Sequence, residues 1–136
     1  MLTLDQIKPG VLAYFAPQRL AEALHFDRPL IGRDRVPRPF VCLYSNRIGC
    51  GWTSLSTKPG YGRLVVDRAW FRNAGGRLDA SRSYAAGDLY YGHPSRFVLA
   101  SELTDELDAD SRPWITAEGI AELMRYQAAR DAGVAV

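Results

Sequence analysis

Short apolar segments separated by glycine and proline place the tightest limit on how this chain folds. The 136 residues include 12 glycines and 8 prolines, which divide the sequence into short pieces. Segments of strand length between these turns occur at residues 11–15, 40–44, 52–56, 63–66 and 96–100, and most of them are apolar. Between them, residues 27–39 and 73–88 are expected to be turns and loops, and residues 92–95 to end the second of these loops. This spacing predicts several short antiparallel strands.

Two stretches have helical rather than strand spacing. Residues 19–25 predict one short helical turn with its apolar side chains on one side. Thr116 is expected to cap a longer helix, because Glu118 stands in its first turn and Ile120 and Leu123 continue the spacing to about residue 129. The expected fold is therefore mainly β with a terminal helix (α+β), either a small SH3-like β-barrel or a curled antiparallel sheet with the C-terminal helix packed on it. The length predicts a single domain, residues 1–136.

Composition favours a location in the cytoplasm. The sequence has no apolar run near the length that a bilayer requires and no basic-then-apolar leader, so no membrane association is expected. Its two cysteines, Cys42 and Cys50, lie in or beside expected strands and are predicted to be buried free thiols. With only the distant His25 and His93 to add, they do not make a zinc site. We expect neither a metal nor a cofactor.

Charge is unevenly distributed along the chain. Residues 27–96 carry twelve cationic and five acidic side chains, a balance of +7, whereas residues 97–136 have a balance of −5. Arginine outnumbers lysine fifteen to two, and its planar fork suits bidentate contacts with phosphate or carboxylate. The pattern predicts one face that binds a polyanion and another that is merely solvated. A salt-bridged surface without any ligand is the alternative.

One arginine, two hydroxyls and a lysine stand at the ends of two expected strands. Arg38 begins the strand that continues through residue 44, and Ser56, Thr57 and Lys58 end the next strand. Together these groups are sufficient to hold a phosphodiester. Structural roles are the alternative, with Arg38 paired to an aspartate of the preceding loop and the two hydroxyls bonded to the local backbone of a turn.

The order of these pieces resembles that of the MazF/PemK family of bacterial toxin endoribonucleases. The matching motifs are Pro-Gly-Val-Leu at residues 9–12, Arg-Pro-Phe-Val-Cys-Leu at 38–43, Leu-Ser-Thr-Lys at 55–58, Arg-Leu-Val-Val at 63–66 and Arg-Phe-Val-Leu-Ala-Ser-Glu-Leu at 96–103. The resemblance implies an SH3-like barrel that cleaves single-stranded RNA without a metal. It also implies a homodimer and a cognate antitoxin with an acidic, disordered tail.

The chain also departs from the family pattern. Val11 follows Gly10 directly, where the family has an acidic residue. Residues 71–91 resemble an insertion, and the first loop is longer than in the family. Ser56 precedes Thr57, where the family commonly has threonine first, so either hydroxyl could take the family role.

The resemblance assigns catalysis to Arg38 with Ser56 or Thr57. Arg38 would neutralise the charge of the transition state, and a hydroxyl would orient the reacting group. His93 is the candidate general base, with a role as a turn residue as its alternative. A phosphate track is predicted from Lys58, Arg63, Arg33 and Arg35, and base stacking from Tyr61 and also from Tyr44, Trp52 and Trp70.

Two other functions compete with RNA cleavage. The first is a non-catalytic SH3-like barrel module that binds nucleic acid or a protein partner. The second is a gyrase-poisoning toxin of the same fold, which uses a C-terminal aromatic residue that residues 133–136 lack. Phosphate-binding glycine loops, the His-Glu-x-x-His helix and the Gly-x-Ser-x-Gly turn are all missing from the sequence, which disfavours the enzymes that use them.

Overall fold

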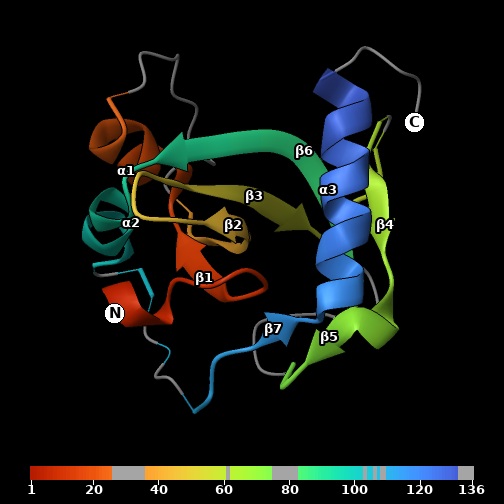
Figure 1. Cartoon of the computed structure of the whole chain (residues 1–136), viewed down its shortest axis with the longest axis horizontal. Helices are drawn as coiled ribbons and strands as arrows, with labels where there is room; N and C mark the ends of the chain where they lie inside the picture. Colours follow the sequence, from red (N-terminus) through yellow and green to blue (C-terminus); the bar gives the residue numbers. More distant parts are fainter. Residues whose placement is uncertain are drawn as a thin grey trace.

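The computed structural model describes residues 1–25, 36–60, 62–74, 83–102, 104, 105, 107 and 110–131. Figure 1 shows its helices and strands. In chain order they are η1 (Leu4–Gln6), β1 (Leu12–Phe15), α1 (Pro17–Ala23), β2 (Arg38–Ser45), β3 (Cys50–Ser56), β4 (Leu64–Val66), η3 (Arg68–Trp70), β5 (Phe71–Arg72), β6 (Ser83–Gly92), α2 (Pro94–Ser101), β7 (Trp114–Ile115) and α3 (Ala117–Asp131).

A curled antiparallel sheet forms the centre of the fold. Its strand order is β1-β2-β3-β6-β4, and β5 and β7 form a separate two-stranded sheet. The long strand β6 pairs with β3 and, near its start, also with β4. It curves from the side of β4 and α3 toward α1 (Figure 1). Within the described residues β1 and β4 remain edge strands, and the sheet does not close into a barrel. The predicted α+β class is confirmed in its curled-sheet form.

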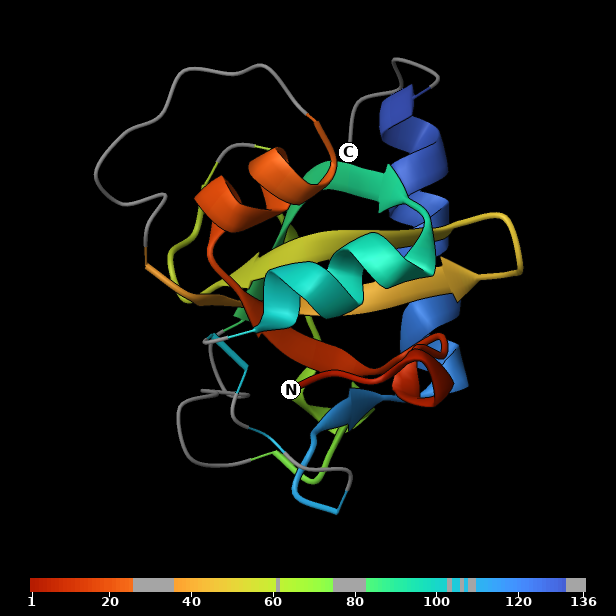
Figure 2. The ribbon, with the colours of Figure 1, turned by 90° about the vertical axis from the view of Figure 1, so that its left-hand side faces the viewer.

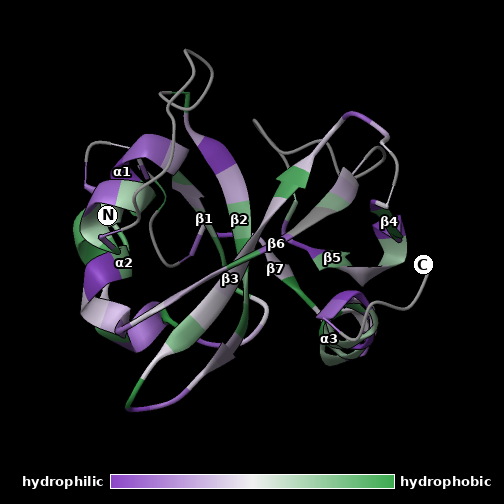
Figure 3. Cartoon of the chain, turned by 90° about the horizontal axis from the view of Figure 1, so that it is seen from above, coloured by the Kyte–Doolittle hydropathy of each residue, from purple (hydrophilic) through white to green (hydrophobic). Residues whose placement is uncertain are grey.

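Helices cover the two faces of this sheet. The paired helices α1 and α2 lie on one face and α3 lies on the other, which is plain when the molecule is viewed from above (Figure 3). Under α1 and α2, Phe15 is the centre of an aromatic cluster with T-shaped contacts to Phe40, Trp52 and Phe97 at centroid distances of 5.2 to 5.9 Å. Under α3 the core is mostly aliphatic, with Phe71 and Tyr126 among its buried side chains. The sheet thus separates two apolar cores.

Two local predictions were wrong. Residues 96–100 were expected to be a strand but belong to α2. The run Phe97 to Ala100 is apolar throughout, and periodicity alone does not distinguish a strand from a buried helix in so short a run. His93 caps this helix and Pro94 starts it, which are start signals for a helix rather than a strand. The second error is β6, which lies in residues expected to be a loop, because its pairing partners are distant in the sequence.

The other predicted elements are confirmed within two residues. The helical turn expected at residues 19–25 is α1, and the helix expected after Thr116 is α3. Strands expected at residues 11–15, 40–44, 52–56 and 63–66 are β1, β2, β3 and β4.

A buried ion pair fastens the segment before β7 to β1. The Arg112 Nη2 atom lies 2.7 Å from the Asp105 Oδ2 atom, and the two side chains are 4% and 0% exposed. Arg112 Nη1 also donates to the Leu12 carbonyl oxygen at 2.9 Å, and the Tyr14 amide donates to Asp105 Oδ1 at 3.1 Å. Both charges therefore have hydrogen-bond partners as well as each other, which is what makes a buried pair tolerable.

The cysteines are buried and unpaired, as predicted. Burial raises the pKa of the Cys42 thiol strongly and the pKa of Cys50 to about 11. Among the described residues, no group of three histidine, cysteine, aspartate or glutamate side chains is placed to hold a metal ion. No helix in the same part of the chain is long and apolar enough to span a membrane.

Candidate functional site

The ladder between β2 and β3 brings Arg38 and Ser56 to the same end of the sheet. Phe40 pairs with Ser54, Val41 with Thr53, and the next pair follows the same antiparallel register. The last pair of this ladder is Phe40 with Ser54, and Arg38 and Ser56 each lie two residues beyond it. Neither residue is fully buried. The ladder therefore brings a guanidinium and a hydroxyl to the same accessible end of the sheet.

A tight turn after β3 adds two further basic side chains. The Ser56 Oγ atom accepts hydrogen bonds from the Lys58 amide at 3.1 Å and from Arg63 Nη1 at 3.3 Å. The same Arg63 nitrogen donates to the Lys58 carbonyl oxygen at 2.7 Å. Gly60 leaves room for this arrangement, since a Cβ atom there would lie 3.1 Å from the Arg63 side chain. We call Arg38, Ser56, Lys58 and Arg63 the basic edge.

Positive charge on the basic edge is largely uncompensated. Residues 36–66 contain four cationic side chains and no acidic one. Within the described residues, the side chains of Arg38 and Lys58 have no hydrogen-bond or ion-pair partner. Thr57 is exposed in the turn, so it is accessible but less constrained than Ser56. Unpaired arginine and lysine at one accessible edge are suited to binding an anion that has several oxygens.

His93 is not brought together with the basic edge. Cys50 pairs with Gly92 at the start of β3, whereas Ser56 is its last residue. The six residue steps from Cys50 to Ser56 span about 20 Å in an extended strand, so His93, which follows Gly92, lies at the opposite end of β3. Its ring also has a local task, because Nδ1 accepts a hydrogen bond from the Ser95 amide at 3.2 Å and caps α2. The expectation that His93 reaches the same site as Arg38 is therefore corrected.

The aromatic residues proposed for base stacking have different surroundings. Trp52 is fully buried in the aromatic core and cannot stack on RNA, so this prediction was wrong. Trp70 is half-buried and packs beside Gly119. Tyr44 is half-buried and pairs with the exposed Tyr91 at a centroid distance of 6.1 Å, near the β2–β3 hairpin and away from Ser56. Of the remaining predicted RNA contacts, Arg33, Arg35 and Tyr61 lie outside the described residues.

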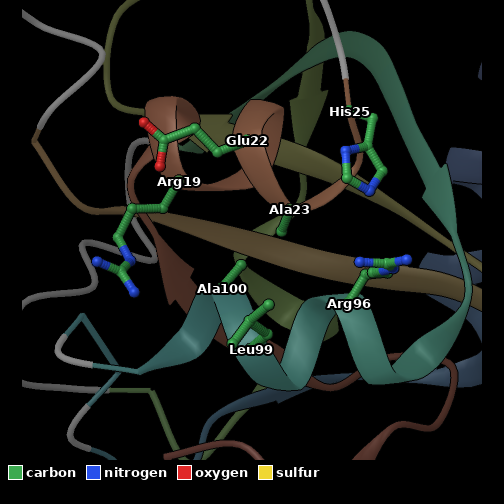
Figure 4. Close-up of a pocket in the computed structure, with 7 residues that line it drawn as sticks. All are labelled: Arg19, Glu22, Ala23, His25, Arg96, Leu99 and Ala100. Carbon is green, nitrogen blue, oxygen red and sulfur yellow. The ribbon is translucent and has the colours of Figure 1, made fainter.

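A second basic feature was missed by the sequence reading. Helices α1 and α2 lie side by side on one face of the sheet (Figure 2). A groove between them is lined by basic side chains from both sides (Figure 4). The sequence does contain a sign of this groove, because Arg19 and Arg96 both stand on the polar sides of short amphipathic stretches. Reading residues 96–100 as a strand removed that signal.

The arrangement at the basic edge can bind phosphate and stabilise negative charge on it. An arginine fork spans two oxygens of a phosphodiester, and a hydroxyl beside it can donate to a third oxygen or orient an attacking group. Within the described residues near Ser56 no carboxylate or imidazole is placed to take a proton.

Comparisons with protein-family models, with curated proteins and with solved structures found no match for this chain.

Proposed function

We propose that this protein binds single-stranded RNA along the basic edge and cleaves it there without a metal ion. The observation that carries the proposal is the β2–β3 ladder, which brings Arg38 and Ser56 to the same end of the sheet. The turn after Ser56 adds Lys58 and Arg63, and residues 36–66 contain no acidic side chain. Single-stranded RNA suits an open edge of the protein because its phosphates and bases are both accessible. The sequence resemblance to toxin endoribonucleases supports the same conclusion.

Cleavage would proceed by attack of the ribose on its own phosphate. The 2′-oxygen forms a bond to phosphorus and releases its proton to solvent, while the bond to the 5′-oxygen breaks and that oxygen takes a proton from solvent. The products are a 2′,3′-cyclic phosphate and a 5′-hydroxyl. Arg38 neutralises the charge that develops on the phosphorane, and Ser56 orients the 2′-hydroxyl. His93, the residue expected to act as the base, lies at the other end of β3, so the proton passes to solvent.

A module that binds RNA or a protein partner without cutting is the second candidate. The distance of His93 from Ser56 favours it, because a missing base removes a contribution of about 10²- to 10⁴-fold to the rate. A cognate acidic antitoxin, a homodimer and a cytoplasmic location are further proposals that follow from the resemblance.

The decisive experiment uses purified protein, a mixed-sequence single-stranded RNA and EDTA. We expect slow fragmentation with cyclic phosphate ends, and loss of both cleavage and binding in Arg38→Ala. Arg125→Ala serves as the matched control, since Arg125 is an exposed arginine of α3 with a partner of its own, Glu122. Binding without cleavage would favour the second candidate, and absence of both would exclude either form of the proposal.

A further inference from the structure

The two helices on one face of the sheet leave a groove of about 270 Å³ between them. Its floor is apolar and consists of Ala23, Leu99 and Ala100, with Leu99 47% exposed. Figure 4 shows Arg19 at one end and Arg96 near the other. The volume is close to the lower limit for small-molecule sites, which suits one nucleotide rather than a large ligand.

Positive charge in this groove is not neutralised by the described part of the chain. The His25 ring faces the Arg96 guanidinium across the groove (Figure 4). Glu22 is the acidic lining residue, but its carboxylate points away and accepts a hydrogen bond from Gln18 Nε2 at 3.2 Å. The Nε atom of Arg19 is buried and has no hydrogen-bond partner among the described residues.

The groove begins next to the basic edge. Phe15 pairs with Arg38, and α1 starts two residues after Phe15, so Arg19 stands in the first helical turn beside the start of β2. Helix α1 continues from Arg19 to Ala23, about 6 Å at the helical rise, and His25 follows two residues after its end. A single extended strand could therefore contact Arg38 first, then Arg19, and then His25 with Arg96.

Resting on the proposed function, we propose that the α1–α2 groove binds the continuation of the RNA strand held at the basic edge. Phosphate oxygens lie between His25 and Arg96, and a sugar or base rests on the apolar floor beside Leu99. Arginine recognises phosphate through paired hydrogen bonds, and an apolar floor accepts a nucleoside. An acidic peptide would meet the same charges, but the continuous path from Arg38 favours a nucleic acid strand.

The test measures binding of two oligouridylates, 3 and 10 nucleotides long, by fluorescence anisotropy. Both carry 2′-O-methyl groups so that neither is cleaved. Arg96→Ala is expected to weaken binding of the longer strand about tenfold and to leave the shorter strand unchanged. The slope of log affinity against log salt should fall by about 0.7 for the longer strand. Arg96→Lys should keep much of the affinity, and Arg125→Ala is the control.

Each outcome separates this inference from the proposed function. If Arg96→Ala binds the 10-nucleotide strand as the control does, while Arg38→Ala loses both strands, the groove inference is overturned and RNA binding stands. If the wild-type protein binds neither strand, both ideas are overturned. A decaglutamate peptide whose binding depends on Arg96, with no Arg96 effect on RNA, would assign the groove to acidic peptides instead and overturn the inference.

Discussion

Arginine has opposite surroundings in two regions of this molecule. Arg112 is almost fully buried, and its guanidinium donates to the Asp105 carboxylate, to backbone carbonyls and to the Gln6 side chain. Arg38 stands at an accessible strand end and has no such partner among the described residues. A buried charge requires every one of its partners for the fold to be stable, whereas an unpaired charge remains available to a ligand. The same side chain is thus structural in one place and a candidate binding group in the other.

The largest expected effect is on stability at the buried pair. Arg112→Met leaves the Asp105 carboxylate buried without its partner, so the free energy of unfolding should fall by about 3–5 kcal/mol. Urea denaturation measures this change. The double variant with Asp105→Leu should recover much of the loss, because neither charge is then buried.

Substitutions of two accessible arginines test the difference between buried and accessible arginine side chains. Arg125→Ala removes a surface ion pair and should change stability by no more than about 0.5 kcal/mol. Arg38→Ala should cost less than about 1 kcal/mol while abolishing RNA binding. A loss at Arg38 as large as the loss at Arg112 would show that Arg38 is structural, and the comparison would fail.

The next effect separates the two hydroxyls of the turn. Ser56→Ala removes the hydroxyl at the same end of the sheet as Arg38 and should lower the rate of RNA cleavage about a hundredfold. Thr57→Ala, at an exposed position, should lower it less than about threefold. Initial rates in EDTA at saturating RNA provide the measurement. The reverse order would transfer the catalytic role to Thr57.

A smaller effect is expected at Lys58, which contributes charge without a fixed partner. Lys58→Ala should reduce the salt dependence of RNA binding by about 0.7 in the slope of log affinity against log salt, which corresponds to one phosphate contact. The cleavage rate at saturating RNA should remain unchanged. Titrations at several salt concentrations test this, and an unchanged slope would remove Lys58 from the phosphate track.

The smallest effect is expected at the buried thiols. Because burial raises the pKa of Cys50 to about 11 and raises that of Cys42 further, both stay protonated at pH 8. Iodoacetamide should therefore not modify the native protein, although both thiols should react in urea. Native thiols bind protons more tightly than unfolded ones, so the free energy of unfolding should fall as pH rises from about 9 to 11. Rapid modification at pH 8 would contradict this.

The sequence predicted an element best where the residues that indicate it lie within that element. The apolar spacing of residues 19–25, the capping Thr116 and the strand-length segments bounded by turns predicted α1, α3, β2 and β3 within two residues. They failed for β6, whose strand character comes from pairing with β3 and β4. They also failed for α2, where an apolar run of four residues fits a strand or a helix equally well.

The sequence by itself determined the α+β class, the two buried thiols and the excess of arginine, because composition and periodicity express these directly. Only the tertiary structure decided which charges are paired and which are accessible. Arg112 pairs with Asp105 within a buried network, His93 lies at the other end of β3 from Ser56, and Arg38 and Ser56 lie at the same end of the sheet. The physical reason is that strand register and helix packing join residues far apart in the chain, and no local pattern encodes those distances.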